Sequence, residues 1–416
     1  MEHFLSTFDM FQKERSHESP ELLQIRQRAF THFSHLGFPT KRWEDWQFTD
    51  FSPLKKIEFQ METENEFIPG KHHYSLENVY CITLLNGRFL PEQSIVPPGV
   101  LIQSKLDLCL ENIQLEDQNN PFWALNTSLM NCGLSIHIPN HFHLDHPIHI
   151  LFISGDSDTP IMNHPRINIQ IGEQSSVTLI EQYAEGENID VWNNCATLAQ
   201  IGKGSLLNHY RLQEDQGYHT ETVNYLLEKD SSLKMVQFNK STELYRGDFY
   251  LHFGGENASA QINGLSLLKN NQHMDTRVLI NHNQPNCQSN QFFKYILDDK
   301  ATGVFNGRVI VEKNSQKTDS SQSNKNLLIS RNSSMHSNPQ LEIYADDVRC
   351  SHGSSTGQLN EDALYYLRSR GISIDTAKML MVEGFAGEIL QLIHLPTVST
   401  YFHSKLSQWL EELNHD

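Results

Sequence analysis

Residues 167–180, INIQIGEQSSVTLI, contain two runs of alternating apolar residues separated by a polar turn. Ile167, Ile169 and Ile171 alternate before the turn, and Val177 and Leu179 resume the alternation after it. A period of two residues is typical of a β-strand that buries one face. The stretch therefore predicts two strands joined by a short corner.

The same corner recurs along the chain. Turn residues at Gly172, Gly202, Glu228, Gly254 and His282 are separated by steps of 30, 26, 26 and 28 residues. A repeat of this length, made of strands and turns, is typical of a solenoid whose coils bury their inward residues against each other. No long amphipathic helix separates the strands, which argues against a βαβ fold. The pattern predicts a mainly β fold with a parallel β-helix core over residues 79–357, and a β-sandwich remains the alternative.

Residues 1–78 are predicted to form an N-terminal helical domain with an aromatic loop. Ser19 and Pro20 have the residue types of an N-cap and a first helical position, and Gly37 is a candidate C-terminal cap. The aromatic residues of the loop are Trp43, Trp46 and Phe48. Such side chains either pin a loop onto a core or stack against a ligand, and we expect the first role.

Residues 358–416 return to helical periodicity and are predicted to form a C-terminal helical domain. Asn360 is a candidate N-cap, and two further helices are expected at about 375–394 and 397–413. The last helix has an apolar stripe formed by Val398, Tyr401, Phe402, Trp409, Leu410 and Leu413. Such a stripe covers the parent core or docks a partner protein, and we expect both roles.

Charge and hydropathy exclude several classes of function. The 416 residues include 32 basic and 50 acidic side chains, a formal net charge of −18, so we expect no nucleic-acid partner. No apolar run approaches the roughly 18 residues of a membrane span. The N-terminus carries charges where a signal peptide needs an apolar stretch. We therefore expect a cytoplasmic protein with no membrane partner.

The cysteines form no recognisable cluster-binding motif. They are scattered at Cys81, Cys109, Cys132, Cys195, Cys287 and Cys350, with no CxxC pair. In a reducing compartment the expected state is a buried free thiol. There is no GxxxxGK[ST] phosphate loop either. We expect the isolated chain to hold no stable cluster and to hydrolyse no ATP.

Two local motifs suggest chemistry but lack part of the expected pattern. The histidines His137, His141, His143, His146 and His149 lie close in sequence, and imidazole is the commonest metal ligand. Prolines at 139 and 147 interrupt this segment, so the rings need not converge. The run Gly353–Gly357 matches GxSxG, with Ser355 in the nucleophile position. That motif requires a strand that turns directly into a helix, whereas the next predicted helix begins only near Asn360.

Cys350 and His352 form the strongest candidate site. Both follow the acidic pair Asp346–Asp347 in an alternating segment, so an extended backbone places them on one face, about 6.6 Å apart at roughly 3.3 Å per residue. A thiol and an imidazole could share an iron or cluster ligand set with a second chain. The alternative is a packed cysteine beside a satisfied histidine. The acidic pairs Asp298–Asp299 and Asp346–Asp347 are expected to form corners.

Long stretches of the chain resemble the SufB/SufD family of iron–sulfur cluster assembly proteins. The resemblance is strongest in HNQPNCQSNQFFKYILDDKATGVFNGRVI (residues 282–310) and in LEIYADDVRCSHGSSTGQLNEDALYYLRSRGI (residues 341–372). The segment Gly37–Trp46 is similar to the GxPT…W segment of the SufD branch. Aligned through Leu327–Leu328, an interface cysteine of the SufB branch falls on Asn324, so the chain resembles the SufD branch.

The resemblance implies a right-handed parallel β-helix flanked by helical domains, acting as a non-catalytic scaffold subunit. It implies pairing with a SufB-like paralogue and binding of a SufC-like ABC-type ATPase by the C-terminal helices. A nascent iron–sulfur cluster or iron would be held transiently at the partner interface. The interface histidine of the family falls on His352 and its neighbouring cysteine on Cys350. The alternatives are a homodimer of the isolated chain, and a stand-alone β-helix enzyme acting on carbohydrate or acyl groups.

Overall fold

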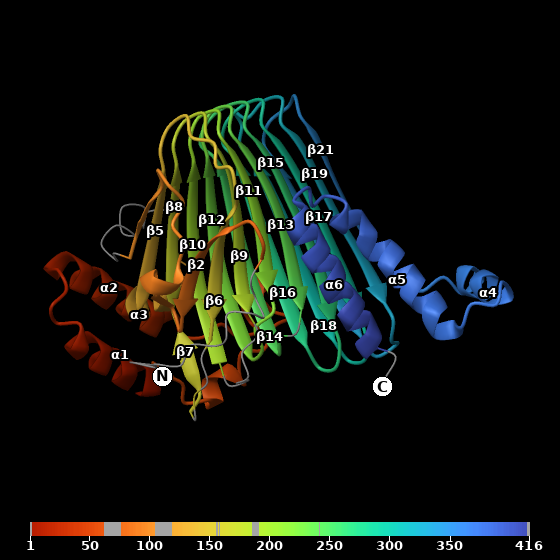
Figure 1. Cartoon of the computed structure of the whole chain (residues 1–416), viewed down its shortest axis with the longest axis horizontal. Helices are drawn as coiled ribbons and strands as arrows, with labels where there is room; N and C mark the ends of the chain where they lie inside the picture. The colour runs from red at the N-terminus through yellow and green to blue at the C-terminus, as the bar shows by residue number, and fades with distance from the viewer. Residues whose placement is uncertain are drawn as a thin grey trace.

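The computed structural model describes residues 2–61, 76–104, 119–154, 157, 159–184, 191–240 and 242–413. Most of them form a parallel β-solenoid in which each coil contributes one strand to sheet A and the next strand to sheet B (Figure 1). Within these residues, seven successive coils run from β8 and β9 to β20 and β21. The predicted mainly β fold with a parallel β-helix core is confirmed, and the β-sandwich alternative is wrong.

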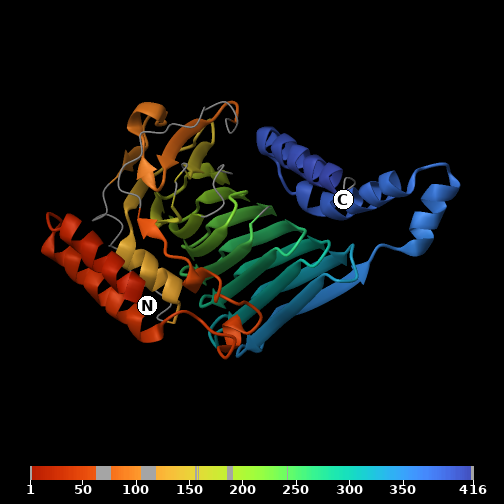
Figure 2. The ribbon, with the colours of Figure 1, turned by 90° about the horizontal axis from the view of Figure 1, so that it is seen from below.

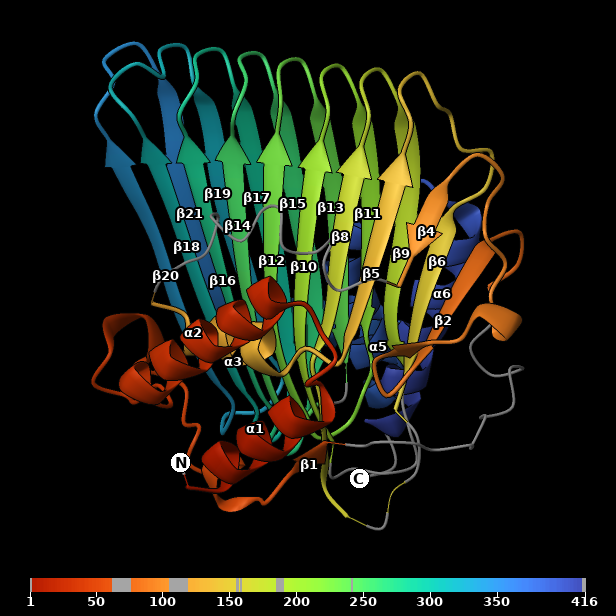
Figure 3. The same ribbon diagram turned by 90° about the vertical axis from the view of Figure 1, so that its left-hand side faces the viewer.

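The strands of each sheet are stacked in the order of the coils (Figure 3). Sheet A contains β1 (Gln60–Met61), β4 (Leu101–Gln103), β5 (Cys132–Ile138), β7 (Ile161–Asn163), β8 (Pro165–Ile171), β10 (Val191–Ile201), β12 (Tyr218–Leu227), β14 (Leu244–Phe253), β16 (His273–His282), β18 (Thr302–Val311) and β20 (Ser334–Ile343). Sheet B contains β2 (Tyr80–Leu85), β3 (Arg88–Phe89), β6 (Ile148–Ile153), β9 (Ser176–Ala184), β11 (Leu206–Gln213), β13 (Ser232–Lys240), β15 (Ser259–Leu268), β17 (Gln288–Leu297), β19 (Asp319–Leu328) and β21 (Arg349–Gln358).

The corners between sheet A and sheet B repeat one backbone conformation. Each contains a residue with positive φ, and the series is Gln174, Gly204, Asp230, Asn257, Asn286 and Lys317. The backbone N–H of each of these residues donates to a carbonyl in the corner of the next coil, as in Gly204 N–H to Lys229 O at 2.9 Å. Gly, Asn and Asp predominate because they tolerate the left-handed region. The corners predicted from the sequence repeat therefore coincide with the strand ends.

Three large hydrophobic clusters hold the fold together. The first fills the solenoid between the sheets and includes Ile169, Leu207 and Phe253. The second lies between the outer face of sheet B and the C-terminal helices. The third packs the N-terminal helices onto the outer face of sheet A through aromatic side chains. Burying apolar surface on both outer faces explains why helices flank the solenoid on two sides (Figure 2).

The six α-helices within the described residues are α1 (Glu2–Glu14), α2 (Pro20–Leu36), α3 (Pro121–Leu129), α4 (Glu361–Ser369), α5 (Ile374–Leu390) and α6 (Pro396–Glu412). The predicted caps are confirmed: the Ser19 side chain accepts a hydrogen bond at the start of α2, and Gly37 has φ +68° at its end. The predicted C-terminal helices correspond to α4, α5 and α6.

Two helices were not predicted from the sequence. Helix α1 places Phe4, Phe8 and Phe11 on one buried face, a helical spacing visible in the sequence. Helix α3 interrupts the early coils, and all nine of its residues are buried. Because α3 has no exposed face, its polar residues do not form the solvent-facing side of an amphipathic pattern.

Candidate functional site

The last coil of the solenoid forms an open end. Strands β20 and β21 are the terminal strands of their sheets, so each pairs with a neighbour on one side only (Figure 3). Nine of the ten residues of β21 are exposed. An unpaired strand edge presents free N–H and C=O groups and accepts a further strand. The open end, defined by β20 and β21, is therefore the part of the solenoid suited to pairing with another chain.

The predicted site residues Cys350 and His352 both lie on β21. Their register partners on β19 are Ser320 and Gln322, which are buried and face the interior. Cys350 and His352 therefore face the same side of the sheet, toward the lumen of the solenoid. His352 is exposed because no further coil covers it. The predicted placement of both side chains on one face follows from the strand geometry.

The two side chains differ in their environment. Cys350 is half-buried and packs against the interior cluster. Burial raises the pKa of its thiol, and the negative charge of Asp319 adds to that effect. A neutral thiol is a poor ligand because the thiolate is the form that binds metal. His352 makes no hydrogen bond among the described residues. In its neutral form, one ring nitrogen has a lone pair that can bind a metal ion.

The ligand set at the open end is incomplete within this chain. No group of three or more His, Cys, Asp and Glu side chains in the described residues could hold a metal ion. The pair Cys350 and His352 supplies at most two of the four ligands that a tetrahedral site needs. Any iron or cluster bound here would take its other ligands from a second chain or from solvent.

The histidine segment does not form a site. His137, His141, His143 and His146 are exposed. His149 is buried and hydrogen-bonded to Gln182 at 2.9 Å, and burial lowers its pKa to about 4. His149 is therefore a neutral interior histidine bonded through Nε2 alone, with Nδ1 buried and unpaired.

The remaining sequence motifs have structural positions. Gly353–Gly357 lies wholly within β21, so Ser355 does not occupy the strand-to-helix turn that a hydrolase nucleophile requires. Asp298–Asp299 follows β17 and Asp346–Asp347 follows β20, which confirms both pairs as corner residues. Cys195 and Cys287 are buried free thiols and Cys81 is a partly buried one. Cys109 and the side chain of Cys132 lie outside the described residues.

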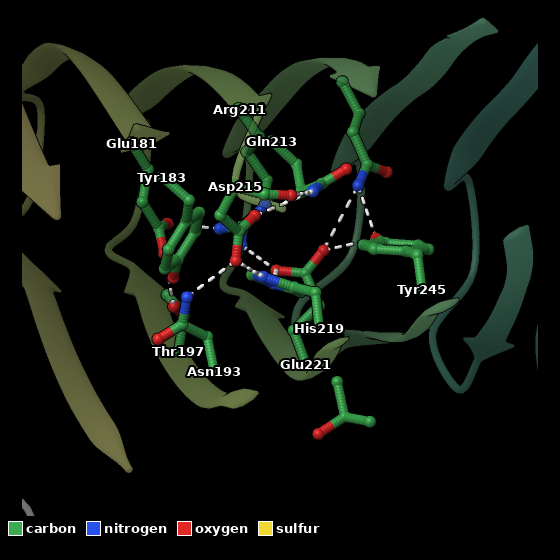
Figure 4. Close-up of polar contacts among 12 residues, drawn as sticks. Glu181, Tyr183, Asn193, Thr197, Arg211, Gln213, Asp215, His219, Glu221 and Tyr245 are labelled. Atoms are coloured by element: carbon green, nitrogen blue, oxygen red, sulfur yellow. Dashed lines mark hydrogen bonds and ion pairs between the residues drawn. The ribbon is translucent and has the colours of Figure 1, made fainter. Parts of the chain in front are cut away.

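A buried ion network crosses the lumen in the middle of the solenoid (Figure 4). It consists of Glu181 on β9, Arg211 on β11, Asp215 in the following turn, and His219 and Glu221 on β12. The Arg211 guanidinium donates to the carboxylates of both Glu181 and Glu221, which lie on opposite sheets. The His219 ring is 2.8 Å from the Asp215 carboxylate. The network joins the two sheets through charged hydrogen bonds.

Burial and charge act in opposite directions on these groups. Burial alone would raise the pKa of Glu181 and of Glu221, but the charge of Arg211 and the hydrogen bonds from neighbouring histidine and tyrosine side chains together lower both to about 2. Burial alone would lower the pKa of His219, but Asp215 and Glu221 raise it to about 9. His219 is therefore protonated at neutral pH. Because the network is closed to solvent, it has no access to a substrate.

The ion network was not predicted, although its signal is present in the sequence. The alternation through Val177 and Leu179 continues to Glu181, so a charged residue falls on the inward register. Arg211 and Glu221 likewise occupy inward positions of their strands. A charged side chain at an inward position needs a partner of opposite charge nearby. The sequence alone does not identify that partner.

The aromatic loop lies as a strap, residues 40–51, across the outer face of sheet A. Trp46 is buried, and the Arg246 guanidinium stacks 3.9 Å from its ring. Arg246 also donates to the carboxylates of Asp248 and Asp275. Phe48 stacks on His336 of β20 with ring centroids 4.2 Å apart. The expected pinning role is confirmed for Trp46, and the strap reaches the open end.

The C-terminal helices differ in how they contact the solenoid. The α6 stripe residues Val398, Phe402, Trp409 and Leu410 are buried in the second cluster, against sheet B and α5. In contrast, α4 has no buried residue and stands away from the solenoid (Figures 1 and 2). Tyr365 and Tyr366 of α4 are 75% and 56% exposed. The predicted stripe therefore covers the parent core, and α4 carries the exposed aromatic surface.

Comparisons with known proteins cover most of the chain. Residues 152–385 match the family described as SUF system FeS cluster assembly, SufBD core domain, and residues 1–150 match the SufBD protein N-terminal region. A SufBD family protein of Synechocystis sp. is 33% identical over 411 residues, covering 92% of this chain and 89% of the relative. The iron–sulfur cluster assembly protein SufD of Escherichia coli is 27% identical over 391 residues, covering 92% and 91%. Among the described residues, no helix is long and apolar enough to span a membrane.

Proposed function

The chain belongs to the SufBD family of iron–sulfur cluster assembly proteins, and on that premise we propose that it is a non-catalytic scaffold subunit. Its open end pairs with a SufB-like subunit, and its C-terminal helical domain binds a SufC-like ABC-type ATPase. The observation that carries the proposal is the exposed His352 on the free terminal strand β21. A relative named as the assembly protein SufD supports the same role.

Strand pairing at the open end would assemble the site. A partner strand added beside β21 would satisfy its unpaired backbone groups and cover His352. Side chains of the partner then complete a ligand set to which this chain contributes His352 and, less directly, Cys350. The iron or nascent cluster is the substrate of the complex and leaves it after assembly. His352 would bind through a neutral ring nitrogen, while the raised pKa of Cys350 disfavours its thiolate.

Helix α4 is the part of the C-terminal domain available to an ATPase. Its exposed Tyr365 and Tyr366 offer aromatic area of the kind enriched at protein interfaces. Helices α5 and α6 connect this surface to sheet B. Glu388 of α5 is 3.1 Å from Lys294, and Glu412 of α6 is 2.8 Å from Lys269. A movement of α4 on nucleotide binding would therefore act on strands of sheet B.

The decisive experiment is His352→Ala in the complete complex. We expect loss of cluster assembly with unchanged complex formation and thermal midpoint, because an exposed imidazole contributes little to the fold. Cys350→Ala should have a milder effect on assembly. His137→Ala removes another exposed histidine, on β5, and serves as the matched control. Normal maturation of iron–sulfur enzymes by the His352→Ala complex would contradict the proposed site.

A further inference from the structure

A column of inward-facing side chains leads from the interior of the solenoid to His352. The strand register aligns Met235, Ile262, Gln291, Gln322 and His352 on successive strands of sheet B. The column is apolar at Met235 and Ile262 and becomes polar over the last three coils. The polar part therefore belongs to the open end and is separated from the ion network by apolar side chains.

The two glutamines of this column have no hydrogen-bond partner. Gln291 is 0% and Gln322 is 3% exposed, and neither the oxygen nor the nitrogen of either amide is bonded. Among the side-chain amides that the structure describes, these are the only two whose oxygen and nitrogen are both closed to solvent and both unpaired. Leaving a buried amide unsatisfied is costly, so such a group calls for a physical explanation.

The surroundings leave few partners within reach. Gly307 of β18 faces Gln291, and a Cβ atom there would lie 3.2 Å from its Oε1. Pro339 follows Gly307 in the register on β20 and has no N–H to offer. Phe293 and Phe305 contact each other across the lumen beside these residues. Neighbouring strands are about 4.8 Å apart, so each amide can reach the next residue of its own column.

We propose that Gln322 and Gln291 are positioning residues for His352, an inference that rests on the proposed role of this histidine. Rotation of these side chains within the column would let the Gln322 oxygen accept a hydrogen bond from one ring nitrogen of His352, and the Gln322 nitrogen donate to the Gln291 oxygen. This ladder satisfies three of the four unpaired amide atoms. It fixes the tautomer of the neutral ring and leaves the lone pair of the other nitrogen facing the partner.

The test is the tautomer of His352 in the purified full-length chain and in the complex. Long-range nitrogen–proton spectra of protein with labelled histidine distinguish the two neutral tautomers, and the His352→Ala spectrum identifies the signal. We expect the tautomer ratio to differ by about fivefold or more from that of the Gln322→Met chain, the factor that corresponds to one net hydrogen bond. Gln322→Met keeps the shape but removes the acceptor, and should return the ring to the tautomer ratio of a free histidine side chain.

Three further variants make the result specific. Gln322→Glu retains an acceptor oxygen and should restore the original tautomer ratio. Gln291→Met leaves the contact between Gln322 and His352 in place and should shift the tautomer ratio less than Gln322→Met does. This variant also tests the ladder if the Gln322→Met chain fails to fold. Gln340→Met alters a half-buried glutamine outside the column on β20 and should change nothing. An unchanged tautomer ratio in Gln322→Met would overturn the ladder while leaving the His352→Ala test of function intact.

Discussion

Arg211 joins two buried carboxylates from opposite sheets in the interior of the solenoid. Its guanidinium neutralises Glu181 and Glu221, and all three side chains are buried. We expect Arg211→Met to lower the free energy of unfolding by about 3–5 kcal/mol, because two buried carboxylates lose their cation. Urea unfolding measures the change.

A surface arginine provides the control for Arg211. Arg308 pairs with Glu342, but both side chains are about one-third exposed. Arg308→Met should therefore change the free energy of unfolding by at most about 1 kcal/mol. If Arg211→Met and Arg308→Met lowered the free energy of unfolding equally, the buried ion network would contribute no more to stability than an ion pair at the surface.

His219 should make stability depend on pH. Folding raises its pKa from 6.5 to about 9, so the protonated ring contributes its full stabilisation below pH 6.5. That contribution, about 3 kcal/mol, is lost as the pH rises through 9. We expect the thermal midpoint to fall between pH 6.5 and 9.5, and to fall less in His219→Gln. Parallel curves for the two proteins would exclude His219 as the titrating group.

At the scale of elements, substitutions on α6 should lower stability, whereas substitutions on α4 should weaken binding of the ATPase. Trp409 of α6 is buried, so Trp409→Ala should cost about 3–5 kcal/mol in the free energy of unfolding. The double substitution Tyr365→Ala and Tyr366→Ala on α4 should leave stability within about 0.5 kcal/mol and weaken capture of the ATPase. Met10→Ala, at another exposed apolar residue on α1, is the control. If the α4 double variant captured the ATPase fully, the ATPase would bind at another part of the chain.

Point substitutions on α4 are a better test of docking than removal of the C-terminal domain. Truncation after Gln358 would also delete α5 and α6. The outer face of sheet B, including Leu212, Phe238 and Leu265, would then lose the helices that cover it. Exposing such an apolar surface favours aggregation, so loss of ATPase binding in a truncated chain would not identify the docking residues.

At the scale of the whole molecule, protection against hydrogen exchange should decrease toward the open end. Strand β13 pairs on both sides, whereas β21 pairs only with β19. We expect amides of residues 349–358 to exchange more than about tenfold faster than those of residues 232–240. Addition of the SufB-like subunit should slow exchange in β21 and leave β13 unchanged. Equal protection of both strands in the isolated chain would argue against a free edge.

Much of the fold could be predicted because its signals are local. Alternating apolar residues mark the strands, and residues suited to positive φ mark each corner, as at Gly204 and Asn257. Ser19 and Asn360 mark helix starts through caps that involve only the next turn. Helix α3 escaped prediction because it is buried all round and so has no amphipathic pattern.

The sequence by itself determined the coil repeat, the helix ends and the placement of Cys350 and His352 on one face of a strand. Only the tertiary structure decided that Arg211 meets Glu221 across the lumen, that Gln291 and Gln322 lie in the column beneath His352, and that α6 is buried while α4 stands free. The physical reason is register. Alternating apolar residues determine within a few positions which side chains of a strand face the interior. Which side chains of neighbouring coils meet depends on the corner lengths, and these vary from one coil to the next.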